Sequence, residues 1–118
     1  MPHENFRVIE DKKMDQLPKE VLVWFYEHKR KKGLFVYTWQ EQHYLLIALG
    51  MRPNPGYRLE LIKVEGDEKE TDVFVEERHP EKDKFYPQVV VYPYILAEVR
   101  GSIRVWMIQS DRQILRFG

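Results

Sequence analysis

The apolar residues of this chain change their spacing at Gly33, and that change limits the folds the chain can adopt. Before Gly33, Leu17, Val21 and later apolar residues recur at the spacing of one helix face, which favours an amphipathic helix. After Gly33, apolar residues alternate with polar ones or form short runs, as they do in strands. We therefore predict one helix over residues 18–31 and a β region over residues 34–118.

The predicted helix has boundary signals at both ends. Pro18 suits the first turn, because its missing N–H needs no partner there. Four basic residues, Lys29–Lys32, would complement the negative end of the helix dipole. Gly33 is typical of a residue that ends a helix. Residues 1–14 carry only a short apolar cluster and form either a flexible tail or a short strand.

The β region reads as short strands joined by turns. We expect strands at residues 34–39, 44–49, 57–64, 73–77, 88–98, 103–108 and 114–117. The apolar residues change face near Leu61, which indicates a bulge. Pro93 cannot donate a ladder hydrogen bond, so it predicts an edge strand or a bulge. Short connections between about seven strands favour a mainly antiparallel sheet, curved or closed into a barrel-like sandwich, with the helix packed on it.

Length and composition limit the class of protein. A chain of 118 residues is one domain in length, and the fold class that we predict is α+β. Its 19 basic and 19 acidic residues cancel, which argues against a nucleic-acid or membrane partner. The chain has no cysteine, so disulfides and thiolate chemistry are excluded. Residues 1–15 lack the apolar core of a signal peptide, and no apolar run reaches the length of a membrane helix, so we expect a cytoplasmic protein.

Catalytic patterns are weak in this sequence. Ser102 and Ser110 lie in no recognisable nucleophile motif. Glu76 and Glu77 are adjacent in a predicted strand and would point to opposite faces, so they cannot act as a facing acid–base pair. The histidines match no compact metal motif in their spacing; they are His3, His28, His43 and His79. We therefore predict a non-enzymatic protein without catalytic residues, bound metal or cofactor.

The strongest functional signal lies in two proline-containing segments. In the segment from Gly50 to Tyr57, two prolines stiffen the chain and Gly56 permits a positive φ. A rigid loop loses less entropy on binding, although the same loop could simply connect two strands. Further along, tyrosines flank Pro93, and such amphipathic rings occur both in cores and in binding surfaces. The residues that we predict to contact a partner are Arg52, Pro53, Asn54, Pro55, Gly56, Tyr57, Tyr92 and Tyr94.

The same two segments resemble a known family. The segment Gly50–Tyr57 resembles the G-x-(K/R)-P-T-G-G-Y element of the PrcB C-terminal domain family, with Asn54 and Pro55 in place of the usual Thr-Gly. The later segment is similar to the family's strand with a Tyr-Pro-Tyr signature, and the likeness spans roughly residues 45–99. The residues that match are Gly50, Pro53, Gly56, Tyr57, Tyr92, Pro93 and Tyr94. The resemblance implies a bacterial, non-catalytic protein that associates with a protease complex.

Our leading interpretation is a protein-binding module that presents the rigid Pro/Gly loop and the tyrosine-rich strand to a protein partner, with a protease as one candidate. Two alternatives stay open. The chain could inhibit a protease by using the same loop as a wedge, or it could bind a small ligand within an aromatic-lined sheet. Strand edges that the sequence does not assign could also pair between copies of the chain, which leaves a homo-oligomer open.

Overall fold

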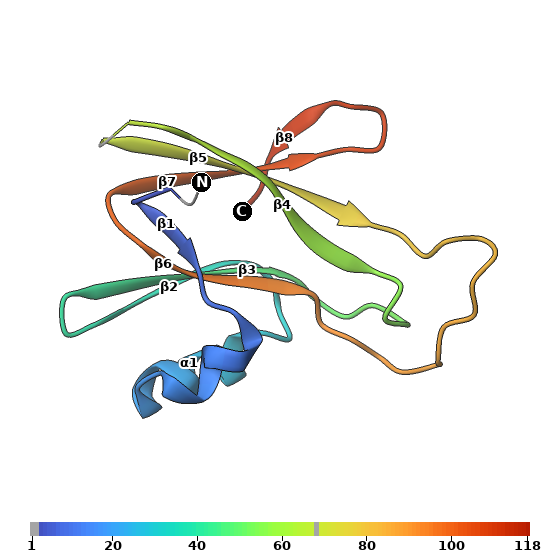
Figure 1. Ribbon diagram of the computed structural model, residues 1–118, viewed down its shortest axis with the longest axis horizontal. Helices are drawn as coiled ribbons and strands as arrows, with labels where there is room; N and C mark the ends of the chain where they lie inside the picture. The colour runs from blue at the N-terminus through green and yellow to red at the C-terminus, as the bar shows by residue number, and fades with distance from the viewer. Residues whose placement is uncertain (1–2, 68) are drawn as a thin grey trace.

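The computed structural model describes residues 3–67 and 69–118, and it consists of two stacked β-sheets with one α-helix on the outside (Figure 1). Its elements in chain order are β1 (Phe6–Val8), the 3₁₀-helix η1 (Asp11–Gln16), α1 (Lys19–His28), β2 (Lys32–Trp39), β3 (Gln42–Leu49), β4 (Arg58–Gly66), β5 (Glu70–Arg78), β6 (Tyr94–Val99), β7 (Ser102–Ile108) and β8 (Ile114–Arg116). The first sheet has the strand order β1-β6-β3-β2 and the second β4-β5-β7-β8.

The α+β class and the mainly antiparallel pairing are confirmed, but two details of the predicted architecture, about seven strands and a curved or barrel-like form, are imprecise. The described residues form eight strands rather than seven, and their two sheets stay open instead of closing into a barrel. One pair, β5 with β7, is parallel. The parallel pair arises because the chain leaves the second sheet after β5, adds β6 to the first sheet, and returns as β7.

The helix lies where the sequence predicts it, but it is shorter. α1 begins at Lys19 with Pro18 as its N-cap, and it ends at His28 with Lys29 as its C-cap. Gly33 does not end the helix, because it lies in β2. β2 starts at Lys32, which pairs with Leu49 of β3. The chain must therefore leave the helical conformation several residues before Gly33.

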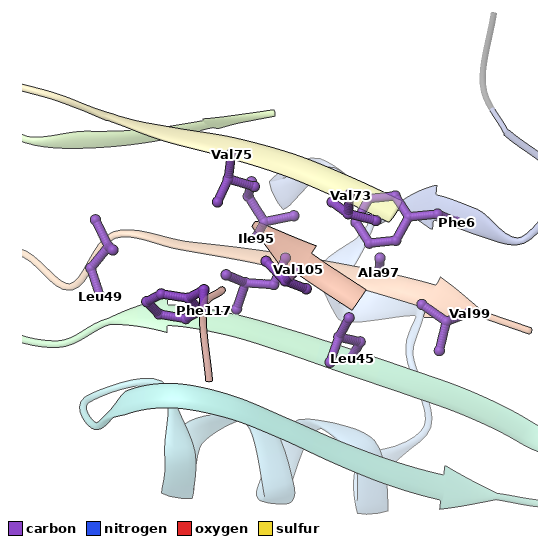
Figure 2. Close-up of a cluster of buried hydrophobic side chains, with 11 residues drawn as sticks. Phe6, Leu45, Leu49, Val73, Val75, Ile95, Ala97, Val99, Val105 and Phe117 are labelled. Atoms are coloured by element: carbon purple, nitrogen blue, oxygen red, sulfur yellow. The ribbon is translucent and has the colours of Figure 1, made fainter. Parts of the chain in front are cut away.

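Strand β3 is buried on both faces and separates two apolar cores. Leu45 and Ile47 point toward the second sheet, into the cluster that Figure 2 shows with Val73, Val75 and Val105 from β5 and β7. Leu46 and other alternate residues of β3 point the opposite way and pack under α1. Burying each such side chain stabilises the fold by roughly 1.5–3 kcal/mol. Burial on both faces explains why this strand is a continuous apolar run rather than an alternating pattern.

Several local predictions are confirmed. Residues 6–8 form a strand rather than a tail. The hairpin of β2 and β3 exists, but its turn is only Gln40 and Glu41, both with positive φ, which is the two-residue turn that matches the twist of a hairpin. The register of β4 against β5 shifts between Leu61 and Lys63, so the bulge is present.

The predicted strand over residues 88–98 is only half correct. β6 begins at Tyr94 and lies in the interior of its sheet, between β1 and β3. Pro93 directly precedes this strand and marks neither a sheet edge nor a bulge. Its carbonyl accepts a hydrogen bond from the Leu49 N–H at 3.1 Å. Pro93 lies opposite Leu49 at the end of the ladder and cannot return this bond to the Leu49 carbonyl, which accepts from Arg52 Nη1 at 3.2 Å instead.

Candidate functional site

Both proline-containing segments are loops at the same end of the sandwich (Figure 1). The 50–57 loop joins β3 to β4, and the 79–93 loop joins β5 to β6. An isolated antiparallel bridge connects them: the Arg52 N–H donates to the Val91 carbonyl at 2.8 Å, and the Val91 N–H donates to the Arg52 carbonyl at 2.9 Å. Segments that are far apart in the sequence are therefore held side by side.

The first residues of the 79–93 loop are also fastened to the 50–57 loop. A Cβ atom at Gly56 would lie 2.8 Å from Pro80 Cβ, so only glycine fits this close approach. Next to it, the Tyr57 and His79 rings pack edge to face with their centroids 5.7 Å apart. With the bridge at Val91, the 79–93 loop is held near both of its ends.

This packing corrects the reason that we expected for Gly56. Gly56 is not among the residues with positive φ, whereas Gly50 is, at 83°. The glycine at position 56 is required by the contact with Pro80, and the glycine at position 50 by the left-handed backbone where β3 ends. Sequence alone could not separate these two requirements, because Pro80 is remote along the chain.

Arg52 ties the 50–57 loop to the second sheet. Its Nε donates to Glu77 Oε2 at 2.7 Å and its Nη2 to Glu77 Oε1 at 3.2 Å, so the pair is bidentate. Its Nη1 donates to the carbonyls of Leu49 and Met51. The hydrogen bond to Glu77 and that residue's charge raise the pKa of Arg52, against the opposing effect of partial burial. Arg52 therefore holds the loop in place through bonds to Glu77 of β5 and to the backbone before the loop.

Asn54 stiffens the tip of the same loop. Its Oδ1 accepts a hydrogen bond from the Gly56 N–H at 2.8 Å, and its backbone carbonyl accepts one from the Tyr57 N–H at 3.3 Å. The first of these is the Asx turn that asparagine favours. Pro53 is exposed on the loop, whereas Pro55 is partly buried. The loop thus holds its shape through its own bonds.

The two predicted tyrosines of the later segment are anchored differently. The Tyr94 hydroxyl donates to Asp11 Oδ1 at 2.7 Å, and its ring meets Phe25 of α1 edge-on at 4.9 Å. Burial, followed by the hydrogen bond to Asp11, raises the pKa of Tyr94. Tyr92 lies under the Arg30 guanidinium, 5.5 Å from the ring centroid. The basic segment after the helix thus contacts the candidate site.

An open groove of about 390 Å³ lies between the two segments and collects half of the predicted residues. Its walls include Pro55 and Tyr57 from the 50–57 loop and Tyr92 and Tyr94 from the other segment. The remaining predicted residues do not line the groove; they are Arg52, Pro53, Asn54 and Gly56. Of these, Arg52, Asn54 and Gly56 set the shape of the loop that forms one wall.

The middle of the 79–93 loop carries exposed apolar side chains. Phe85 is fully exposed, and Val89 and Val90 are also exposed. Met51, next to the bridge residue Arg52, is exposed as well. A loop of this length without secondary structure is uncommon in a compact domain and is usually either functional or a linker. We call these four side chains the apolar loop patch.

Sequence reasoning missed several residues of this site. Glu77, Pro80 and Asp11 each contact a predicted residue from a remote part of the chain, and nothing in the local sequence reveals such pairings. Phe85 could have been found, because it follows the charged run of residues 81–84 directly. Phe85 begins an uncharged, mainly apolar run that continues to Val91, and several apolar residues in one loop indicate either a buried anchor or a contact with a partner.

The groove combines apolar and aromatic surface with three charged side chains, one of which is the cation of Arg58. Asp11 and Glu60 are the carboxylates on its walls. Within residues 3–67 and 69–118, no three histidine, aspartate or glutamate side chains gather as a metal site would require. No helix of the described chain is both long and apolar enough to cross a membrane. The chemistry that the groove favours is recognition of an apolar or aromatic side chain.

Comparison with known proteins gives one positive result. The family model "PrcB C-terminal" matches residues 43–100, a segment that starts in β3 and ends just after β6. The matched segment contains both loops and every residue predicted to contact a partner. A search of curated proteins and a search of solved structures each returned no match. The family that this chain resembles over residues 43–100 is therefore the PrcB C-terminal family.

Proposed function

We propose that this chain is a non-enzymatic protein-binding domain of a protease complex, and that it contacts its partner through the groove and the apolar loop patch. The family suggests the association with a protease complex. The single observation that carries the proposed surface is the full exposure of Phe85 on a loop that is fastened near both ends. Exposed apolar side chains that gather on one loop, here Phe85 with Val89 and Val90, are typical of a surface that a partner covers.

The energetics of this loop favour binding. Full burial of the Phe85 side chain by a partner would contribute roughly 1.5–3 kcal/mol. Because Arg52–Val91 and Gly56–Pro80 hold the loop near its ends, less conformational freedom is lost when the partner binds. The charged residues 81–84 would form the polar rim that surrounds an apolar contact.

Site-specific photocrosslinking in cells of the native organism tests this proposal. Benzoylphenylalanine replaces Phe85 in one variant and Val23, an exposed residue of α1, in the control. We expect an adduct of defined mass at position 85 that contains a subunit of a protease complex, and no such adduct at position 23. Identical adducts at both positions, or none at position 85, would contradict the proposal.

The bonds within the 50–57 loop also favour a second candidate function, a protease inhibitor that uses this loop as a wedge. The loop is held in one shape by Arg52–Glu77 and Asn54–Gly56, and such rigidity reduces the entropy lost by an inserted loop. Titration against papain-like and subtilisin-like proteases separates the two functions. A binding domain leaves their rates unchanged at micromolar concentration, whereas a wedge inhibitor slows at least one of them.

A further inference from the structure

Strand β2 differs from the other sheet edges in having no feature that blocks pairing, and we propose that two copies of the chain associate through it. The edge strands are β1 and β2 in the first sheet and β4 and β8 in the second. β1 and β8 span three residues each, and β4 carries alternating charges and a bulge. Short length, charge and bulges are the usual protections of an edge. β2 has eight residues and no charged side chain after Lys32.

The backbone of β2 has its free hydrogen-bonding groups at alternate positions. The two-residue turn makes Trp39 and Gln42 a hydrogen-bonded pair. Pairs in an antiparallel ladder alternate, so the N–H and C=O groups of Leu34, Val36 and Thr38 point away from β3. No strand of the described chain pairs with that side of β2. These groups can pair with an identical strand that runs in the opposite direction.

The side chains of β2 favour pairing about a two-fold axis at Val36. In that register Val36 lies opposite Val36 of the second copy, and Leu34 lies opposite Thr38. The ends are complementary in charge, because Lys32 of one copy comes beside the Gln40–Glu41 turn of the other. Lys32 and Glu41 are both exposed in the single chain. This complementarity of charge favours a second copy over an unrelated strand.

The inner face of β2 is partly uncovered at the same place. Gly118, just after β8, lies against Leu34, but Val36 on the same face of β2 stays 65% exposed. An apolar concavity of about 380 Å³ opens there, with Leu34, Val36 and Ile103 among its walls. Pairing of two copies at Val36 would cover part of this surface. It would also join the β1-β6-β3-β2 sheet of one copy to the same sheet of the other copy, as one continuous sheet.

Analytical ultracentrifugation of the full chain tests the proposal, with Val36→Lys as the disrupting variant and Val23→Lys as the control on an exposed face of α1. We expect the wild type and Val23→Lys to sediment at twice the 14.4 kDa monomer mass at about 100 μM. Val36→Lys places two cations opposite each other, so its mass should fall to that of the monomer. A monomeric wild type, or a Val36→Lys variant that stays dimeric, would overturn the proposal.

A cysteine variant gives a test that does not depend on the folding of Val36→Lys. The chain has no cysteine of its own, and paired positions in adjacent strands lie within disulfide distance. Under mild oxidation, Val36→Cys should therefore form a covalent dimer, whereas Val23→Cys should stay monomeric. Equal yields of covalent dimer from the two variants would overturn the two-fold pairing at β2.

Discussion

The two loops of the candidate site meet at one bridge but keep their shapes in different ways. The 50–57 loop is held along its length, by the Arg52–Glu77 ion pair to β5 and by the bond between Asn54 and Gly56 within the loop. The 79–93 loop is held chiefly near its two ends, and the apolar side chains of its middle face solvent. We therefore propose that the first loop serves chiefly as a support and the second as a contact surface, so substitutions in them should affect different properties.

The largest loss of stability is expected at the close approach between the two loops. Gly56→Val places a branched side chain where a Cβ alone would be 2.8 Å from Pro80 Cβ. Overpacking of this kind lowers the free energy of unfolding by up to about 3 kcal/mol. Chemical denaturation measures this loss. The matched control is the same change in a Pro80→Gly background, where the opposing Cβ is gone. Because Asn54 Oδ1 at 2.9 Å and the Cα of residue 80 at 3.0 Å still lie close, the cost should fall there without vanishing. An equal cost in both backgrounds would show that this contact does not explain the glycine.

A smaller loss is expected at the ion pair that supports the 50–57 loop. Arg52→Gln removes a bidentate bond to Glu77 whose two side chains are largely shielded from solvent. We expect a loss of about 1.5–2 kcal/mol in the free energy of unfolding, because hydrogen bonds to charged groups are stronger than neutral ones.

The pair Arg58–Glu60 provides the control for this prediction. Its closest atoms are 4.0 Å apart and the Arg58 side chain is largely exposed, so Arg58→Gln should change stability by less than about 0.5 kcal/mol. A double-mutant cycle with Glu77→Gln isolates the coupling between Arg52 and Glu77. A coupling energy near zero would mean that Arg52 does not hold the loop through Glu77.

The parts of this site that sequence reasoning could reach are those that depend on neighbouring residues. The hairpin of β2 and β3, the bulge after Leu61 and the stiff Pro/Gly loop all follow from local backbone chemistry. The family resemblance adds that the two segments belong to one sequence pattern, because it rests on residues from both. Their contact through Arg52 and Val91 is known only from the structure. Local patterns, in contrast, cannot tell which strands share a sheet.

Contacts between remote residues account for what was missed. The parallel pairing of β5 with β7 depends on where β6 inserts, and an apolar run has the same composition in either sheet. The pairing of Arg52 with Glu77 is likewise invisible in sequence, because any of several acidic residues could have met that arginine. In the sequence, nothing distinguishes Glu77 from the other charged residues of the strands.

The smallest effect on stability, together with a large effect on binding, is expected at Phe85. Because its side chain is fully exposed, Phe85→Ala removes no packing and should change the free energy of unfolding by less than about 0.5 kcal/mol. A photocrosslinker at the exposed position Met51 reports on the partner without altering Phe85 itself. In the Phe85→Ala background, the yield of its adduct should fall at least tenfold, whereas Val23→Ala should leave it unchanged. A loss of stability without a loss of adduct would reverse the roles of the two loops and make the 79–93 loop the support.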